Sequence, residues 1–172
     1  MEKSAQSAQA VGKPPSASTV VVTQLVQPNH TNYLGNLYGG ELMKWIDMAA
    51  AMAAMKHSGR VCVTVSVDEL SFLAPVKLGQ IVTLYATVNR AFRTSMEVGV
   101  RAERFDPLSQ ETIHTNSAYL TFVAIDENGK PVEVPPIIPQ TAIEQRRYQE
   151  AEIRRRHRLE KRKQIESLRK RG

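Results

Sequence analysis

The spacing of apolar residues predicts one long helix near the start of the chain. Between residues 39 and 58, Ala, Met and Leu dominate and apolar side chains fall on nearly every helical face. A helix of this composition is normally buried on all sides. Gly59 follows as a stop signal, with Lys56 and His57 in the last turn. Five alanines from Ala49 to Ala54 would let this helix lie close against a sheet.

Apolar and polar residues alternate on both sides of this helix, and the alternation predicts strands. The expected strands are residues 19–26, 61–73, 81–92, 95–105 and 112–125. Short turns join the last four, which implies antiparallel pairing. The sequence therefore predicts an α+β domain in which one long helix lies across a five-stranded antiparallel sheet.

The strand at 61–73 has the most regular alternation. Its valines at positions 61, 63, 65 and 67 are expected on one face. Cys62, Thr64, Ser66 and Asp68 are expected together on the other face.

Three segments outside this pattern define the domain boundaries. Residues 1–17 are rich in Ser, Ala, Gln and Pro and predict a disordered leader. Residues 18–140 form the domain, which ends in a proline-rich extended stretch at 130–139. Residues 141–172 predict a basic helical tail, whose apolar residues keep no heptad register.

The net charge of +6 belongs to this tail. Residues 141–172 contain 12 Lys and Arg against 5 Asp and Glu, whereas residues 1–140 contain 11 against 12. Nucleic-acid binding through phosphate contacts is one interpretation, but Tyr148 is the only aromatic residue of the tail, which therefore has little capacity to stack on bases. A charged, solvated helix is the preferred interpretation of the tail, without a nucleic-acid partner.

Several classes of protein are not supported by the sequence. The longest apolar run, Met48–Met55, is far shorter than the ~20 residues of a membrane span. The first 18 residues lack the apolar run of a secretory signal. A single cysteine can form no internal disulfide, so a reducing cytoplasm is expected. Cys62 is the only cysteine, and no phosphate loop, nucleophile elbow, dinucleotide fingerprint or zinc-protease motif is present. We therefore expect no metal and no cofactor.

Asp47 is the most informative residue because it lies in the middle of the apolar helix. An unpaired buried carboxylate costs several kcal/mol at least, so Asp47 must meet water, a polar partner or a cleft. In a cleft it could act as a base. Pairing with Lys44 on a wetted edge is the alternative, and the spacing leaves both open.

Small and polar residues precede this helix. Gly39 and Gly40 leave the first-turn N–H groups uncapped, and such groups suit an anion or a developing oxyanion. A plain loop-to-helix turn is the alternative. Asn32 and Asn36 could orient a water or polarise a carbonyl, although asparagine more often forms turns.

The segment HTNYLGNLYGGELMKWID, residues 30–47, resembles the opening motif of hotdog-fold acyl-CoA thioesterases of the acyl-CoA hydrolase branch. The matching positions are Thr31, Asn32, Gly35, Gly39, Gly40, Met43 and Asp47. Segments 60–80, 95–100 and 119–135 also resemble parts of this family, in the same order. The resemblance covers residues 19–140 and leaves out the leader and the tail.

The resemblance implies a hotdog fold, with the sheet wrapped around the helix, and hydrolysis of acyl-CoA to free fatty acid and CoA. It implies that Asp47 acts as base or nucleophile and that Asn32 assists from a partner subunit. Thr64 would help to position water, and the N–H groups around Gly40 would form the oxyanion hole. A non-catalytic acyl-CoA-binding regulator is the alternative function.

The resemblance also implies partners and a site for CoA. Hotdog domains pair so that two sheets become continuous, with active sites at the interface, and a trimer of such dimers is expected. CoA phosphates require basic groups or N–H donors. The candidate CoA-binding residues are Gly39, Arg93, Thr94, Ser95, Arg90 and Lys130. For the residues around the turn at 93–95, a plain solvated turn is the alternative.

Overall fold

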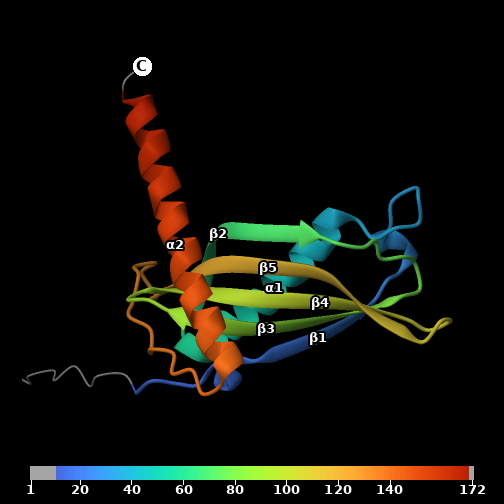
Figure 1. The fold of residues 1–172 in the computed structure, drawn as a ribbon, viewed down its shortest axis with the longest axis horizontal. Helices are drawn as coiled ribbons and strands as arrows, with labels where there is room; N and C mark the ends of the chain where they lie inside the picture. The colour runs from blue at the N-terminus through green and yellow to red at the C-terminus, as the bar shows by residue number, and fades with distance from the viewer. Residues whose placement is uncertain (1–10, 171–172) are drawn as a thin grey trace, which may run out of the picture.

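The computed structural model describes residues 11–170 and confirms the predicted α+β architecture (Figure 1). The elements are η1 Pro15–Ser18, β1 Val20–Leu25, η2 Pro28–His30, α1 Gly39–Ser58, β2 Val61–Phe72, β3 Ile81–Ala91, β4 Ser95–Asp106, β5 Glu111–Ile125 and α2 Ala142–Arg169. The five strands form one sheet in the order β1-β3-β4-β5-β2, and every neighbouring pair is antiparallel. The bounds of α1 are those that the sequence predicted.

The sheet carries a helix on each face. Figure 1 shows α1 behind the sheet and α2 in front of it. The core lies between α1 and the inner face of the sheet, where Ile46 and the alanines of α1 meet Leu84, Val98 and Phe122. At its end α1 stops at Gly59, whose φ of +67° is a conformation that glycine adopts without strain.

The prediction that α1 is buried on all sides is wrong for the single chain. Four methionines on its outer side, Met43, Met48, Met52 and Met55, are 38% to 53% exposed. The sheet covers only the side of α1 that carries the alanines. An exposed apolar stripe of this kind is typical of a surface that another protein covers.

The predicted alternation of β2 is also wrong beyond Thr64. Val65 and Asp68 have no partner residue in β5, so each forms a one-residue bulge that reverses the side-chain alternation. Thr64 precedes both bulges and faces α1, whereas Ser66 and Asp68 face α2 because of them. A bulge leaves no reliable mark in the pattern of a single strand, which is why the sequence placed these residues on one face.

The predicted disordered leader differs from the structure in its last residues. Main-chain atoms of Lys13 bond to Pro136 and Ile138, which lie in the extended proline-rich stretch. The hydroxyl of Ser18 is buried and accepts the Val88 N–H at 3.0 Å. These bonds fix residues 13–18 despite their polar composition, and residues 1–10 of the predicted leader lie outside the described residues.

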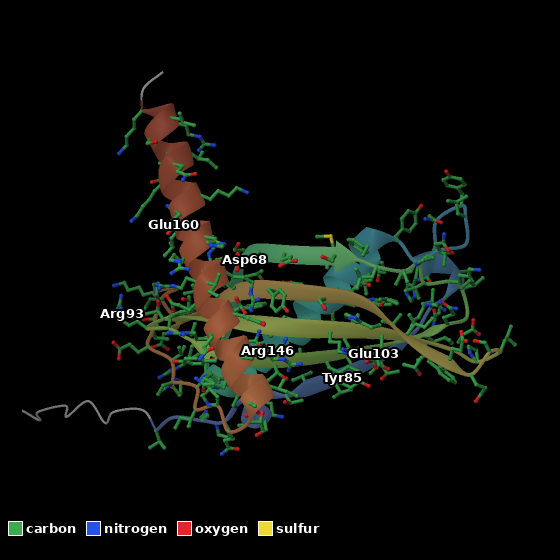
Figure 2. The ribbon with its side chains drawn as sticks, in the orientation of Figure 1. Asp68, Tyr85, Arg93, Glu103, Arg146 and Glu160 are labelled. Atoms are coloured by element: carbon green, nitrogen blue, oxygen red, sulfur yellow. The ribbon has the colours of Figure 1, made fainter. Side chains whose placement is uncertain are left out.

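The C-terminal helix is present, but its first half is not solvated on all sides as the sequence predicted. Thr141 caps α2, accepting the Glu144 N–H at 3.2 Å while the Glu144 carboxylate accepts the Thr141 N–H at 3.0 Å. Arg154 and Arg158 then bond to acidic residues of the sheet. Beyond them α2 extends past the β2 edge, where Glu160 lies (Figure 2). Within residues 11–170, no helix is long and apolar enough to cross a membrane.

Candidate active site

A pocket of about 330 Å³ opens between α1 and the inner face of the sheet. Gly40 and Asp47 lie seven residues apart, or about two helical turns, so they share one face of α1. Both line the pocket, and the opposite wall consists of aliphatic residues of β2 and β5. These wall residues are Val67, Leu70, Ala118 and Leu120. The result is an apolar cavity beside one carboxylate.

The Asp47 carboxylate is half-buried and is held by Thr64 of β2. The Thr64 hydroxyl donates to Asp47 Oδ1 at 2.7 Å. Lys44, which the sequence left open as a partner of Asp47, bonds instead to Glu41 at 3.1 Å. The structure thus brings Asp47 and Thr64 together at the cavity, an arrangement in which the threonine fixes the direction of the carboxylate.

The start of α1 lies at the same pocket. Tyr38 occupies the N-cap position and no side chain caps the first turn in the part of the chain that the structure describes. Apart from its chain neighbours and the backbone of α1 itself, no atom lies within 4 Å of the place that a Cβ would take at position 40, so a ligand can reach the backbone of Gly40. Gly39 lines a neighbouring pocket of about 210 Å³ with Phe72.

Asn32 and Asn36 form a turn within the single chain. Asn32 Oδ1 accepts the N–H groups of Leu34 at 2.9 Å and Asn36 at 3.2 Å, which is the turn-forming role that the sequence left open. Asn32 is not among the residues that line the Asp47 pocket. The tip of this loop is exposed, with Tyr33 94% accessible.

Arg93, Thr94 and Ser95 form the turn between β3 and β4, away from the Asp47 pocket. Their carbonyl groups accept main-chain N–H groups of Val134, Ala124 and Phe92. The turn is therefore fixed by its backbone, while the Arg93 side chain is exposed, as Figure 2 shows. Lys130 is likewise exposed, in a turn where its N–H donates to Asp126 at 2.8 Å.

Arg90 is engaged by α2 instead. Its guanidinium bonds to Glu152 at 2.9 Å and to the Tyr148 carbonyl at 3.3 Å, and it lies 4.1 Å from the centre of the Tyr148 ring. These contacts place Arg90 on the outer face of the sheet, opposite Asp47. Arg90 therefore packs α2 in this structure, and we leave it out of the proposed CoA site.

Other chemically active residues are accounted for by packing. Burial raises the pKa of the Cys62 thiol, and a bond with Ser58 opposes this only in part, so the thiol stays protonated. Burial lowers the pKa of His57, whose Nε2 donates to the Pro135 carbonyl at 2.7 Å. No group of three His, Cys, Asp or Glu side chains suited to a metal occurs among residues 11–170.

Residues 34–109 match the family model described as the thioesterase superfamily. The chain is 39% identical to a solved hexameric acyl-CoA thioesterase in its apo form, with a TM-score of 0.85 over 88% of this chain and 97% of that one. The chain belongs to the thioesterase superfamily. Its sheet wrapped around α1 is the hotdog fold that these relatives share.

Two further relatives are informative. Acyl-coenzyme A thioesterase 11 of Mus musculus is 43% identical over 140 residues, which are 81% of this chain but 23% of the mouse protein. The acyl-CoA hydrolase of Staphylococcus aureus, solved with butyryl-CoA, CoA and CoA disulfide, is 39% identical with a TM-score of 0.81, covering 91% of this chain and 98% of that one. The sequence motifs indicated a likeness over residues 19–140. The coverage of 91% shows that the structural likeness extends beyond that range.

Variants of the Staphylococcus aureus enzyme have also been solved in which an asparagine, an aspartate and a threonine are each replaced by alanine. These three residues are spaced fifteen and seventeen positions apart. Asn32, Asp47 and Thr64 have the same spacing in this chain.

Proposed function

We propose that this protein hydrolyses acyl-CoA thioesters to free fatty acid and CoA. The observation that carries this proposal is the Asp47 carboxylate, held by Thr64 beside an apolar pocket that the uncapped start of α1 also lines. The complex of the Staphylococcus aureus relative with butyryl-CoA supports the substrate class. The family membership supports the reaction type.

In the proposed mechanism the acyl chain lies along Val67, Leu70 and Leu120, with the thioester carbonyl near the start of α1. Asp47 takes a proton from a water molecule, whose oxygen attacks the carbonyl carbon. N–H groups around Gly40 stabilise the oxyanion that forms. The carbon–sulfur bond then breaks and the CoA thiolate leaves, a good leaving group that needs no strong general acid.

We further propose that two subunits share each active site. In the single chain β2 is an edge of the sheet and Val61, Val63, Val65 and Val67 on it are 40% to 62% exposed. Pairing of two β2 edges would join two sheets into one and cover these valines. The same partner would cover the methionines of α1 and place its Asn32 loop at the Asp47 pocket. The solved hexameric relative supports a trimer of such dimers.

The proposed CoA phosphate site is the β3–β4 turn, with Arg93, Thr94 and Ser95, together with Lys130. Gly39 would contact the part of CoA nearest the thioester. Arg93→Gln should raise KM for acyl-CoA and leave kcat unchanged, because a phosphate contact far from the thioester stabilises substrate and transition state equally. A loss confined to kcat would remove this turn from the CoA site.

The function is tested by release of CoA thiol from acyl-CoA esters of increasing chain length. We expect turnover that depends on chain length, because the acyl chain fills a pocket of limited depth. Asp47→Asn should abolish most of this turnover. Its matched control is Glu111→Gln, which replaces an exposed carboxylate at the start of β5 by an amide. Tight CoA binding without turnover at any chain length would favour the non-catalytic regulator and contradict the hydrolase.

Shared active sites are tested by mixing two inactive variants. Asp47→Asn and Asn32→Ala subunits are unfolded together and refolded as a mixture. If each site takes Asp47 from one subunit and Asn32 from the other, mixed dimers contain one intact site, and activity returns to about a quarter of the wild type by random pairing. Absence of any recovery would place both residues in one subunit's own site.

A further inference from the structure

A network of polar contacts joins α2 to the bulged part of β2, on the face opposite the active-site pocket. The Asp68 side chain is 6% exposed and accepts hydrogen bonds from Ser66 at 2.5 Å and from Thr121 at 2.9 Å. Arg158 of α2 completes the network, donating to both Asp68 and Thr121. Figure 2 shows Asp68 beside α2 where that helix crosses the sheet.

The pairing with β5 explains why this network matters for the other face. Partners across two strands lie on the same face of a sheet. Thr64 pairs with Phe122 and Val67 with Leu120, and both partners are buried toward α1. Ser66 pairs with Thr121, which contacts α2.

An unbulged β2 would present different side chains to the pocket. Side chains alternate strictly along a regular strand, so Ser66 and Asp68 would follow Thr64 on the inner face. A second carboxylate would then enter the apolar cavity, and Val67 would leave it. The two bulges, at Val65 and Asp68, keep Val67 lining the pocket. They also set the place of Thr64 along β5: with residues 69–72 in their present pairing, an unbulged strand would put Thr64 opposite Ala124 instead of Phe122, two residues away from its present place beside Asp47.

We propose that Asp68 and Arg158 are positioning residues, whose ion pair holds the double bulge of β2 in the register that directs Thr64 to Asp47 and Val67 to the acyl pocket. This inference rests on the proposed thioesterase function. It gives α2 a role in that function, because the helix fixes from the outer face the strand that supports the inner face. In this proposal neither Asp68 nor Arg158 contacts the substrate.

The test compares three glutamine variants of α2. Arg158→Gln should lower kcat by about tenfold to a hundredfold, the range expected when a catalytic group is misplaced by an ångström. Arg162→Gln, which loses only an exposed pair with Glu166 one turn further along, should leave kcat unchanged. Arg154→Gln breaks the α2 contact to Glu97 of β4, so it should lower stability but leave kcat of the folded protein unchanged.

A double-mutant cycle tests whether Arg158 acts through Thr64. If it does, Arg158→Gln should reduce kcat strongly in the wild type and only slightly in a Thr64→Val background. Arg158→Lys keeps the charge and should restore most of kcat. Amide hydrogen exchange between residues 64 and 69 should be faster in Arg158→Gln than in Arg162→Gln.

The outcomes separate this inference from the proposed function. Equal kcat values for Arg158→Gln and Arg162→Gln, or additive effects with Thr64→Val, would overturn the positioning role alone. Equal losses in Arg154→Gln and Arg158→Gln would also overturn it, because any loosening of α2 would then suffice. Full activity of Asp47→Asn would instead contradict the proposed mechanism. Should Arg158→Gln not fold, Asp68→Asn takes its place in each comparison, and Arg158→Lys remains the variant that is expected to retain kcat.

Discussion

The two faces of the sheet are packed by different chemistry. On the inner face, fully buried alanines of α1 lie against aliphatic side chains, without ion pairs to the sheet among the described residues. On the outer face, α2 is held by arginines on acidic residues, most deeply by Arg154 on Glu97, which is 1% exposed. The Arg154 guanidinium bonds to both carboxylate oxygens, at 2.7 and 3.0 Å.

The difference shows how one sheet can serve two purposes. Small apolar side chains let α1 approach closely and still leave a cavity beside Asp47. Buried ion pairs contribute less net stability than apolar packing, but they accept only one geometry and so define where α2 lies. Under the proposals above, the inner face provides the reaction site and the outer face fixes the strands around it.

The largest expected effect on stability is on the outer face. Arg154→Ala should lower the free energy of unfolding by about 3–5 kcal/mol, because it leaves the buried Glu97 charge with no cation and only the Asn89 amide as a donor. Replacing both residues, as Glu97→Gln with Arg154→Met, should recover much of that loss. Denaturant unfolding measures both variants, and a loss below that of the exposed control Arg162→Ala would show that the pair is not buried in solution.

A second prediction concerns the inner face. Thr64→Val keeps the side-chain shape but removes the hydrogen bond to the Asp47 carboxylate, and a bond to a charged group contributes about 1.5–3 kcal/mol. We expect kcat for acyl-CoA hydrolysis to fall by the corresponding factor of about ten to a hundred, with KM little changed. Unchanged kcat would mean that Asp47 needs no support from β2.

A third prediction tests the close approach of α1. Ala53 is completely buried, so Ala53→Leu should overpack the interface with the sheet and lower the free energy of unfolding by about 1–3 kcal/mol. Thermal unfolding monitored by circular dichroism measures the change. The same change at the exposed Ala142 of α2 serves as control, and equal stability of the two variants would show that α1 has room to move away from the sheet.

The smallest predicted effect is a pH dependence from His57. Burial lowers the pKa of His57 in the folded protein, so below pH 6.5 the unfolded chain takes up a proton that the folded chain does not. Stability should fall as the pH drops through this window, by at most about 1.4 kcal/mol per pH unit for one proton. His57→Gln keeps a donor for Pro135 and should flatten this slope; an unchanged slope would assign it to other groups.

The elements that the sequence predicted best are those with a strong local signal. The bounds of α1 follow from its composition and from Gly59, and Asp47 stood out as a carboxylate among apolar neighbours. The bulges at Val65 and Asp68 were missed because they depend on the pairing with β5 and on a side chain from α2. These are contacts between residues far apart in sequence.

The docking of α2 was missed for a related reason. Glu97 alternates with Met96 and Val98, a pattern that predicts an exposed acid, so nothing in its own strand indicates that α2 buries it. A list of arginines in the tail could not identify which of them bonds to it. Asn32 illustrates the same limit in another form, because its proposed catalytic role requires a second subunit.

The most direct test is to measure turnover and stability together on Asp47→Asn. A half-buried carboxylate beside an apolar cavity is unfavourable for folding, so its neutral analogue should unfold at the same or a slightly higher temperature. Its kcat for acyl-CoA should fall by about a hundredfold to ten-thousandfold, the usual contribution of a general base. A variant that is equally active, or that loses activity only because it unfolds, would contradict the role of Asp47.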